Sequence, residues 1–375
     1  MAPRDRSLPI ALDAMGGDNA PRALVRGAAR AVRELDVSVS LVGRADTLER
    51  ELAALEGEDA ASRSRLTVVN ATEVVAMDEH PAAAVRSKRD ASINVACREV
   101  SSGAARAVVS AGNSGAVLAA GLLGLRRIRG VARPAIGALV PNRTPDGYTF
   151  VLDVGANTDS RPEWLAQFAV MGAVYSTEML GVRDPRVALL SNGEERGKGD
   201  ERVQAADPLL AALPIRFIGN VEGRDLFSDA ADVVVCDGFA GNVALKVAEG
   251  VAEFLFATIA TEARASLRGR IGGLLLKPKL RPLRDRVDYR TTGGALLLGV
   301  AGEVVIAHGR SDELAVMNAI RVADRAATHD VSGVIASRLA AAGTAAAATA
   351  EPPTEATTEP AAAATASTTN PREQS

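Results

Sequence analysis

The stretch Ile10-Ala-Leu-Asp-Ala-Met-Gly-Gly-Asp-Asn-Ala-Pro21 decides the fold class of this chain. The apolar residues at its start predict a buried strand, and the Asp and the Gly-Gly pair that follow predict a tight turn. Asp18-Asn19-Ala20-Pro21 then supplies a helix-start signal. A strand, a glycine turn and a helix N-terminus together let backbone N–H groups approach an anion, so the stretch predicts a phosphate site.

Similar apolar segments alternate with helical patterns along most of the chain. The helical patterns include Arg22–Leu35, Ile93–Ser102 and Pro162–Leu180. This alternation predicts βαβ units and a mostly parallel sheet, in which ligands bind beyond the carboxyl ends of the strands. The predicted strands are rich in Val, Ile and Leu, as is typical of strands covered on both faces: Leu8–Leu12, Val37–Val42, Leu66–Asn70, Ala107–Ser110, Ala135–Val140, Thr149–Asp153, Arg186–Leu190, Ile215–Gly219 and Val233–Cys236.

Composition limits the class of protein. The chain has 375 residues, 47% of them hydrophobic and 24% charged, which is ordinary for a globular protein of one large or two smaller domains. No apolar run approaches the roughly 18 residues of a membrane span, and the start lacks a signal-peptide pattern, so we expect a cytoplasmic protein. Two cysteines and three histidines favour neither a disulfide framework nor a metal site.

Two of the predicted strands end in polar turns that allow either a ligand-binding or a structural role. After Ala107–Ser110, the side chains of Asn113 and Ser114 either donate to a bound oxygen or form a plain turn in which Ser114 caps the next helix. After Thr149–Asp153, the carboxylates lack the further ligands that magnesium needs, so we expect Asp153 to organise its loop. Asn157 in the same loop is assigned to the substrate site.

The loop Leu189-Leu-Ser-Asn-Gly-Glu-Glu-Arg-Gly-Lys-Gly-Asp-Glu201 is the most chemically specific. It fails as a P-loop, because only three residues separate Gly193 from Gly197 and a glycine stands at the required Ser or Thr position. Lys198 between two glycines nevertheless suits an anion, since the backbone can come close and the ammonium adds a point charge. The alternative is a solvated charged loop.

Two later turns carry further candidates. Gly241 permits a close turn after the last predicted strand, and the neighbouring Asn242 has an amide of the type found in oxyanion holes. Cys236 lies inside that apolar strand and is expected in the core rather than as a nucleophile. His308 is either a general acid or base or a hydrogen-bond partner of its own loop.

The helical stretch 251–290 differs from the rest of the chain. Its part Arg264–Arg290 holds nine basic and two acidic residues, a net charge of +7 in a chain of formal net charge −3, interleaved with leucines. Such a segment suits an anionic membrane surface or an acidic protein partner, or forms a dimer helix with snorkelling side chains. Few aromatic side chains accompany the charges, so nucleic acid is not expected. The residues expected to make these contacts are Arg268, Arg270, Lys277, Lys279 and Arg281.

The chain as a whole resembles the phosphate acyltransferase family of bacterial phospholipid synthesis (PlsX). Asn19 departs from the family, which usually has His there, so a catalytic histidine at this position is excluded. Ser114 and Asp200 replace the usual Thr and Asn. The motifs occur in family order between Leu8 and Asp330: Ala-Leu-Asp-Ala-Met-Gly-Gly-Asp, Ser-Ala-Gly-Asn-x-Gly, Leu-Asp-Val-Gly-Ala-Asn, Ile218-Gly-Asn-Val-Glu-Gly-Arg224 and Cys-Asp-Gly-Phe-x-Gly-Asn.

The resemblance implies an activity and an architecture. Acyl-[acyl carrier protein] and inorganic phosphate would give acyl phosphate and free carrier protein, without a cofactor. The fold would be a three-layer α/β/α, Rossmann-like sheet related to phosphotransacetylases and isopropylmalate dehydrogenases, in one domain spanning 1–340 with a protruding helical element and a disordered tail at 341–375. A homodimer would associate peripherally with the inner face of the plasma membrane and pass its product to a membrane glycerol-3-phosphate acyltransferase.

The chemistry of this reaction assigns roles. Phosphate must be oriented and the tetrahedral oxyanion stabilised, whereas a thiol of pKa about 8.5 leaves without a strong general acid. We expect Lys198 to hold phosphate and Asn242 to donate to the thioester oxygen. The other expected contacts of phosphate or substrate are Asp13, Gly16, Gly17, Asn113, Ser114, Asn157, Gly241 and His308.

Three alternatives stay open on the residues alone. A dehydrogenase of the isopropylmalate type would need a nicotinamide site and a metal-binding carboxylate cluster. A phosphotransacetylase acting on coenzyme A thioesters would differ only in its acyl donor. A non-catalytic membrane scaffold would explain the basic segment but not the glycine turns.

Overall fold

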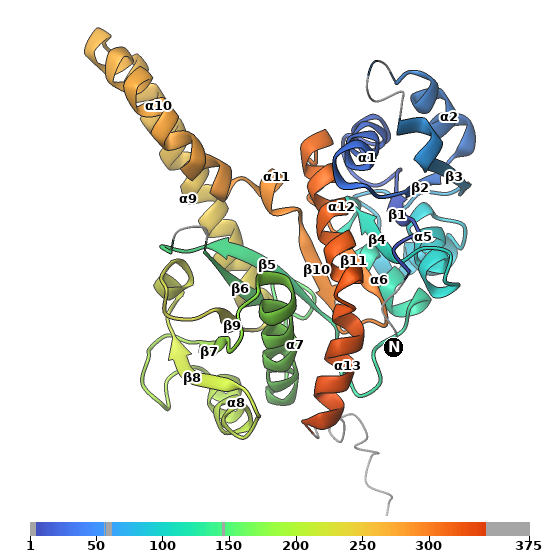
Figure 1. Cartoon of the computed structure of the whole chain (residues 1–375). Coiled ribbons are helices and arrows are strands. Elements are labelled where there is room, and N and C mark those ends of the chain that lie inside the picture. Colours follow the sequence, from blue (N-terminus) through green and yellow to red (C-terminus); the bar gives the residue numbers. More distant parts are fainter. Residues whose placement is uncertain (1–4, 56, 58–61, 145–146, 343–375) are drawn as a thin grey trace, which may run out of the picture.

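The computed structural model describes residues 5–55, 57, 62–144 and 147–342. They contain one 11-stranded sheet. Its strands are β1 (Ile10–Asp13), β2 (Val39–Gly43), β3 (Leu66–Asn70), β4 (Ala107–Ser110), β5 (Ala135–Pro141), β6 (Tyr148–Leu152), β7 (Arg186–Leu190), β8 (Arg216–Val221), β9 (Val233–Val235), β10 (Ala295–Leu298) and β11 (Glu303–Ile306). Their order in space is β3-β2-β1-β4-β11-β10-β5-β6-β9-β7-β8 (Figure 1).

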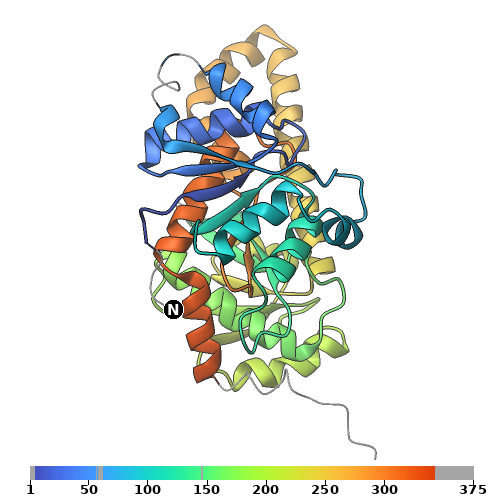
Figure 2. The same cartoon turned by 90° about the vertical axis from the view of Figure 1, so that its right-hand side faces the viewer.

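Helices cover both faces of this sheet, which confirms the three-layer fold. The helices are α1 (Arg22–Leu35), α2 (Ala45–Ala53), α4 (Pro81–Ser87), α5 (Ser92–Ser101), α6 (Ser114–Gly124), α7 (Pro162–Leu180), α8 (Glu201–Ala211), α9 (Gly238–Arg264), α10 (Leu267–Val287), α11 (Tyr289–Thr292), α12 (Glu313–Thr328) and α13 (Val331–Ala341), with short 3-10 helices at Ser62–Arg65 and Gly223–Phe227. In Figure 2, α12 and α13 lie on one side of the sheet and α5 and α6 towards the other.

Alternate residues of the strands fill two separate cores. Ile10 and Leu12 of β1 belong to the same core as the buried residues of α1, α7 and α12, whereas Ala11 belongs to the core that α5 and α6 form on the other face. Successive side chains of a strand point to opposite faces, so a strand covered on both faces must be apolar throughout. This is why the buried strands appear in the sequence as uninterrupted apolar runs.

The sheet consists of two parallel blocks that run in opposite directions. The first block is β3-β2-β1-β4-β11 and the second is β6-β9-β7-β8. Between them β10 is antiparallel to both β11 and β5, and β5 is antiparallel to β6. Seven of the ten strand pairings are parallel, so the sheet is mostly parallel as expected, but the carboxyl ends of the two blocks lie at opposite edges of the sheet.

The strands β10 and β11 were not predicted from the sequence. Each has four residues, and glycines at 293, 294, 299 and 302 flank or separate them, so the segment has the composition of a turn. The nine predicted strands are all present within a few residues. The expected tail falls mainly at 343–375, outside the described residues, and α13 ends at Ala341.

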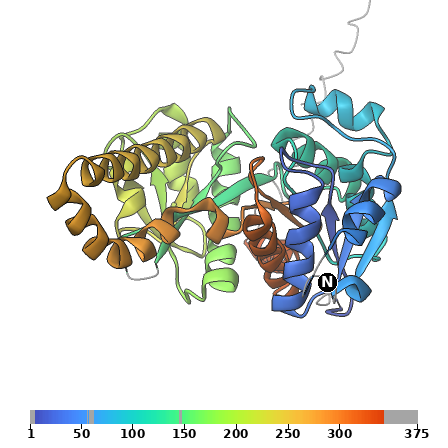
Figure 3. The same cartoon turned by 90° about the horizontal axis from the view of Figure 1, so that it is seen from above.

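The helices α9 and α10 form a hairpin that projects from the sheet (Figures 1 and 3). α9 begins at Gly238 rather than near Val251 as expected, because Asp237 caps it directly after β9. α10 has no buried residue, and α9 buries only its first-turn glycines. No helix among the described residues has both the length and the apolarity to cross a membrane.

Candidate active site

The turns after β1 and β11 are joined at the edge of the first block. The Asn19 amide donates to the carbonyls of Arg310 and Ser311 at 3.2 and 3.1 Å. α1 begins at Arg22, directly after the predicted helix-start signal Asp18-Asn19-Ala20-Pro21, but no side chain caps it. The side chain of Asn19 holds two turns together instead.

Asp13 is buried where the turns after β1 and β4 meet. Its Oδ2 accepts from Ser110 Oγ at 2.7 Å, and burial raises its pKa although this hydrogen bond acts in the opposite sense. A Cβ on Gly16 would lie 2.8 Å from the backbone nitrogen of Gly112, and Gly17 has φ +102°. Packing and backbone conformation thus account for both glycines, and phosphate binding by this turn stays a prediction.

Asn113, not Ser114, caps α6. Its Oδ1 accepts from the N–H groups of Gly115 and Ala116 at 3.0 and 3.2 Å, and its Nδ2 donates to the carbonyl of Met77 at 3.0 Å. The alternative in which Ser114 caps the helix is therefore wrong, and the Asn113 amide bonds to the protein backbone. Ser114 is exposed, and its hydroxyl makes no hydrogen bond within the described part of the chain, so it stays open to a ligand.

His308 follows β11 and faces α9. Its Nδ1 accepts from the Arg310 N–H at 3.2 Å, which places the proton of the neutral ring on Nε2. Burial, Lys246 of α9 and Arg310 lower its pKa, so the ring offers a donor at neutral pH rather than a cation. Arg310 also pairs with Glu253 of α9 at 3.8 Å, so α9 reaches the turns of the first block.

At the carboxyl end of the second block, Asp153 organises the turn after β6, as expected. Its Oδ1 accepts from the N–H groups of Ile136, Gly155 and Ala156 at 3.0, 3.0 and 2.9 Å. Its Oδ2 accepts from the backbone and side-chain nitrogens of Asn157 at 2.7 and 3.0 Å. Burial raises the pKa of Asp153, although these bonds oppose the shift.

The start of α9 packs directly on this turn. A Cβ on Gly241 would lie 1.9 Å from the carbonyl oxygen of Asp153, and one on Gly238 would lie 2.8 Å from that of Asn157. Only glycine permits this approach at Gly241. The next residue, Asn242, is exposed, and its amide has no hydrogen-bond partner among the described residues.

Lys198 lies on the loop after β7, between Gly197 at φ +89° and Gly199 at φ +96°. The loop backbone is held by a hydrogen bond of 2.8 Å from the Gly199 N–H to Asn192 Oδ1. The Lys198 side chain is exposed, and in the residues that the structure describes its ammonium pairs with no carboxylate. A cation is thus presented to solvent by a loop that is itself fixed.

Arg202 of α8 was not identified from the sequence, yet it joins three loops at this edge. Its guanidinium lies 2.7 Å from Asp200, 3.1 Å from Asp237 and 3.7 Å from Asp159, and its side chain is 23% exposed. Asp200 caps α8 and Asp237 caps α9. The available signal was the recurrence of an aspartate after each of three strands, since such a group needs a shared cation.

The structure brings the predicted residues into two groups. Asp13, Gly16, Gly17, Asn113, Ser114 and His308 lie at the carboxyl edge of the first block. Asn157, Lys198, Gly241 and Asn242 lie at that of the second, and α9 extends from the second group to His308. A hollow of about 470 Å³ between α1 and α12 contains none of these residues. The five basic candidates of α10 are all exposed, and they belong to neither group.

Neither cysteine is available as a nucleophile. Cys236 is buried, its thiol donates to the carbonyl of Asp153 at 3.3 Å, and burial raises its pKa. Burial also raises the pKa of Cys97 to about 12. The expectation of a core role for Cys236 is therefore confirmed.

Solved structures define the class of fold. A phosphotransacetylase from Streptococcus pyogenes superposes with a TM-score of 0.60 at 17% identity, over 87% of this chain and 95% of that chain. The EutD phosphotransacetylase from Staphylococcus aureus superposes with a TM-score of 0.55 at 17% identity, over 87% and 96%. The protein is an α/β protein of the phosphotransacetylase fold.

Sequence comparison then gives the family. The family described as "Fatty acid synthesis protein" matches residues 8–334. A phosphate acyltransferase from Heliobacterium modesticaldum is 49% identical over 314 residues, and one from Desulfitobacterium hafniense is 50% identical over 315 residues; each match covers 84% of this chain and 92% of the relative. The chain belongs to this fatty acid synthesis protein family.

Proposed function

We propose that this phosphate acyltransferase takes its acyl group from the thioester of an acyl carrier protein. An oxygen of inorganic phosphate attacks the carbonyl carbon, and a tetrahedral intermediate with a negative oxygen forms. The carbon–sulfur bond then breaks, the thiolate of the carrier leaves with the electron pair, and acyl phosphate remains. Family membership supports the acyl transfer to phosphate, and the motifs shared with the phosphate acyltransferases support the carrier protein as donor.

The assignment of residues rests on the exposed and unpaired side chains of Lys198 and Asn242. Both are exposed and unpaired among the described residues, although the loops that present them are tied by hydrogen bonds and by Arg202. We assign phosphate and its developing charge to the Lys198 ammonium, and the thioester oxygen to the Asn242 amide. Such donors act best when they are fixed before the reaction, because no reorganisation is then needed.

The protein supplies no nucleophile in this scheme. Phosphate is itself the attacking group, and the thiolate is a good leaving group, so the neutral His308 ring serves as a donor to phosphate rather than as an obligatory base. Ser114, with its free hydroxyl, would assist from the same edge as His308. Substrate would thus contact both groups along α9.

The hairpin is assigned to assembly and to the membrane. Val247 and Phe254 of α9 are 58% and 67% exposed, and we assign this apolar face to a second copy of the chain in a homodimer. Leu267, Leu274 and Leu275 of α10 are 72–75% exposed among basic residues, which suits insertion at an anionic membrane surface. Peripheral binding at the inner face of the plasma membrane would deliver acyl phosphate to a membrane glycerol-3-phosphate acyltransferase.

A thiol-release assay tests the function. Palmitoyl-carrier protein is mixed with the purified protein with and without phosphate, and acyl phosphate is trapped with hydroxylamine. We expect thiol release only with phosphate, together with hydroxamate. Release without phosphate would identify a thioesterase, and equal or faster turnover of acetyl-CoA would identify a phosphotransacetylase. No release, with membrane binding retained, would favour the scaffold alternative.

A further inference from the structure

We propose that the acidic protein surface that brings the acyl thioester docks on a patch of arginines beside the second block, and not on α10. The inference rests on the proposed function and locates the binding site of its protein substrate. The arginine patch comprises Arg126, Arg127, Arg129, Arg133 and Arg161.

The arginine patch is an uncompensated positive charge. All five side chains are exposed, and none forms an ion pair with a carboxylate among the described residues. Elsewhere the chain does pair its arginines, as for Arg186 with Asp232 at 3.0 Å. Five unpaired cations on a chain of net charge −3 favour an anionic partner, because like charges left together repel and complementary charge removes that cost.

Part of the patch is held in place before any partner arrives. The guanidinium groups of Arg133 and Arg161 lie 5.1 and 5.7 Å from the ring centroid of Trp164 on α7. One helical turn later, the buried Gln167 accepts from the Ala132 N–H at 2.8 Å and so fixes the loop before β5. Ordered side chains lose less entropy on binding, so these two cations are the best placed to act as anchors.

The patch also adjoins the candidate active site. Arg161 ends the same loop that holds Asn157, and the Asn157 amide donates to the carbonyl of Pro134 at 2.8 Å. Pro134 follows Arg133 directly. The two anchors are therefore connected through Asn157 to the edge that presents Lys198 and Asn242.

The basic residues of α10 are poorly placed for this role. Arg264 follows Asn242 by 22 positions in α9, a distance of about 33 Å at ~1.5 Å per residue, before α10 begins. The base of α10 returns to the turn between β5 and β6, where Arg286 donates to the carbonyl of Asn142 at 2.9 Å. That turn precedes β6, whereas Asp153 follows it. Neither end of α10 therefore lies beside the reacting groups.

Charge reversal tests the location. We compare the double variant Arg133→Glu/Arg161→Glu with Arg183→Glu, a matched change of an exposed arginine beyond the other end of α7. Calorimetry gives the Kd for acyl-carrier protein, and steady-state assays use acyl-carrier protein and acyl-pantetheine as alternative donors. We expect at least a tenfold rise in Kd and KM for the carrier protein in the double variant, with turnover of acyl-pantetheine unchanged. Arg183→Glu should match the wild type.

Three further measurements support the test. Trp164 is the only tryptophan of the chain, so its fluorescence in the wild type should change when a tryptophan-free carrier protein binds. The double variant Arg133→Lys/Arg161→Lys keeps both positive charges. If the partner recognises charge, this variant should retain most of the wild-type affinity for carrier protein. A thermal melt checks that the reversed variant is folded.

The proposal is overturned if the double reversal leaves the Kd for carrier protein unchanged, or if Arg268→Glu/Arg270→Glu raises that Kd instead. Loss of binding to anionic vesicles by the arginine-patch variant, with carrier affinity intact, would make the patch a membrane site and would equally overturn it. Failure of the proposed function looks different, since the wild type itself would then form no acyl phosphate from acyl-carrier protein.

Discussion

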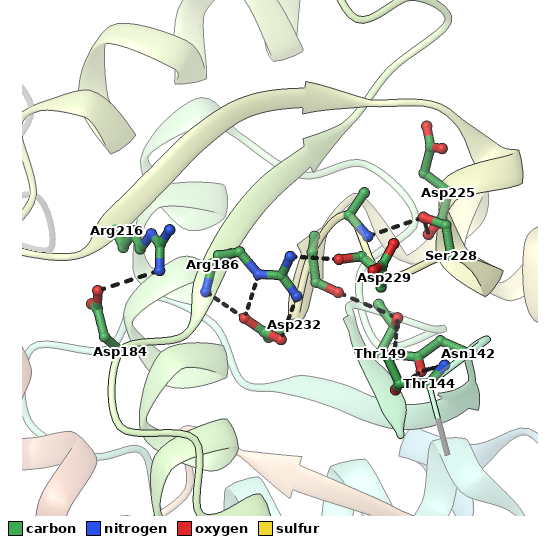
Figure 4. A network of polar contacts seen from close by, with 12 residues as sticks. Asn142, Thr144, Thr149, Asp184, Arg186, Arg216, Asp225, Ser228, Asp229 and Asp232 are labelled. Carbon is green, nitrogen blue, oxygen red and sulfur yellow. Dashed lines mark hydrogen bonds and ion pairs between the residues drawn. The ribbon is translucent and has the colours of Figure 1, made fainter. Parts of the chain in front are cut away.

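The two ends of the second parallel block are built from the same strands but treat polar groups differently. At the amino end, Arg186 donates to both oxygens of Asp232 at 3.0 Å and to the carbonyl of Asp229 (Figure 4). At the carboxyl end, the Lys198 ammonium and the Asn242 amide have no partner among the described residues. One end satisfies its polar groups internally, and the other keeps two of them for a ligand.

This difference indicates that the amino end of the block contributes to stability and the carboxyl end to catalysis. The amino end resembles a structural clamp, because each of the three guanidinium nitrogens of Arg186 has an acceptor. At the carboxyl end, the hydrogen bonds of Asp153 and the ion pairs of Arg202 also hold the loops in place. The outermost side chains there, Lys198 and Asn242, have no partner among the described residues. Changes at the first end should therefore reduce stability, and changes at the second should reduce turnover.

The largest expected effect is on turnover. Lys198→Ala and Asn242→Ala should each lower kcat/KM for acyl phosphate formation by about 10²–10³, the usual cost of one lost transition-state donor. Both side chains are exposed, so the free energy of unfolding should change by less than about 0.5 kcal/mol. Hydroxamate trapping and urea unfolding measure the two quantities. Turnover close to that of the wild type in both variants would remove these residues from the mechanism.

The next effect is on stability. Arg186→Ala leaves the largely buried Asp232 without its cation and should lower the free energy of unfolding by about 1–3 kcal/mol, with turnover per folded molecule unchanged. Arg216 offers a control in the same region, since its pair with Asp184 is exposed and 3.7 Å long (Figure 4). Arg216→Ala should cost less than about 1 kcal/mol. Equal losses in the two variants would contradict the clamp.

A smaller effect on turnover is expected at Arg202, which acts through other residues. Arg202→Ala should lower kcat about tenfold, or about 1.4 kcal/mol in the barrier, because the caps of α8 and α9 lose their shared cation. Arg202→Lys should recover part of the loss. A purely structural role would instead lower the melting temperature while leaving kcat and the KM for phosphate unchanged in the folded fraction.

Much of the scaffold could be predicted from the sequence, because the buried strands carry continuous apolar runs and the long helices have clear boundaries. The helices Arg22–Leu35 and Pro162–Leu180 have the predicted bounds. Strand direction could not be predicted, since the reversal results from three successive antiparallel pairings, β11 with β10, β10 with β5 and β5 with β6. The second of these pairings joins segments far apart in the chain.

The residue types of the candidate site could be predicted from the sequence, but their hydrogen-bond and ion-pair partners could not. Lys198 and Asn242 stand out because glycines surround them, and they do lie at one edge. Whether an amide is free or occupied depends on the fold: Asn113 is occupied by its helix and by Met77, although it looked equivalent to Asn242 in sequence. The role of Arg202 could not be predicted from the sequence, because the three aspartates that it pairs with lie up to 78 positions apart, from 159 to 237.

The smallest expected effect is a pH dependence of the clamp. Burial acts to raise the pKa of Asp232, but the hydrogen bonds and charge of Arg186 outweigh it and the pKa is lowered. A lowered pKa in the folded state stabilises the protein above the unfolded value of about 3.9, and this contribution is lost as the pH falls through the folded value. The stability difference between wild type and Asp232→Asn should thus be full at pH 7 and shrink below about pH 4. Urea unfolding at several pH values measures this stability difference. If the difference grew as the pH fell, the predicted direction of the pH dependence would be wrong.

Turnover and unfolding measured on the same preparations of wild type, Lys198→Ala and Arg186→Ala give the most direct test of the division between the two ends. Lys198→Ala should lose acyl phosphate formation at unchanged stability, and Arg186→Ala should lose stability at unchanged turnover per folded molecule. Turnover losses that simply follow the loss of stability in both variants would contradict the account.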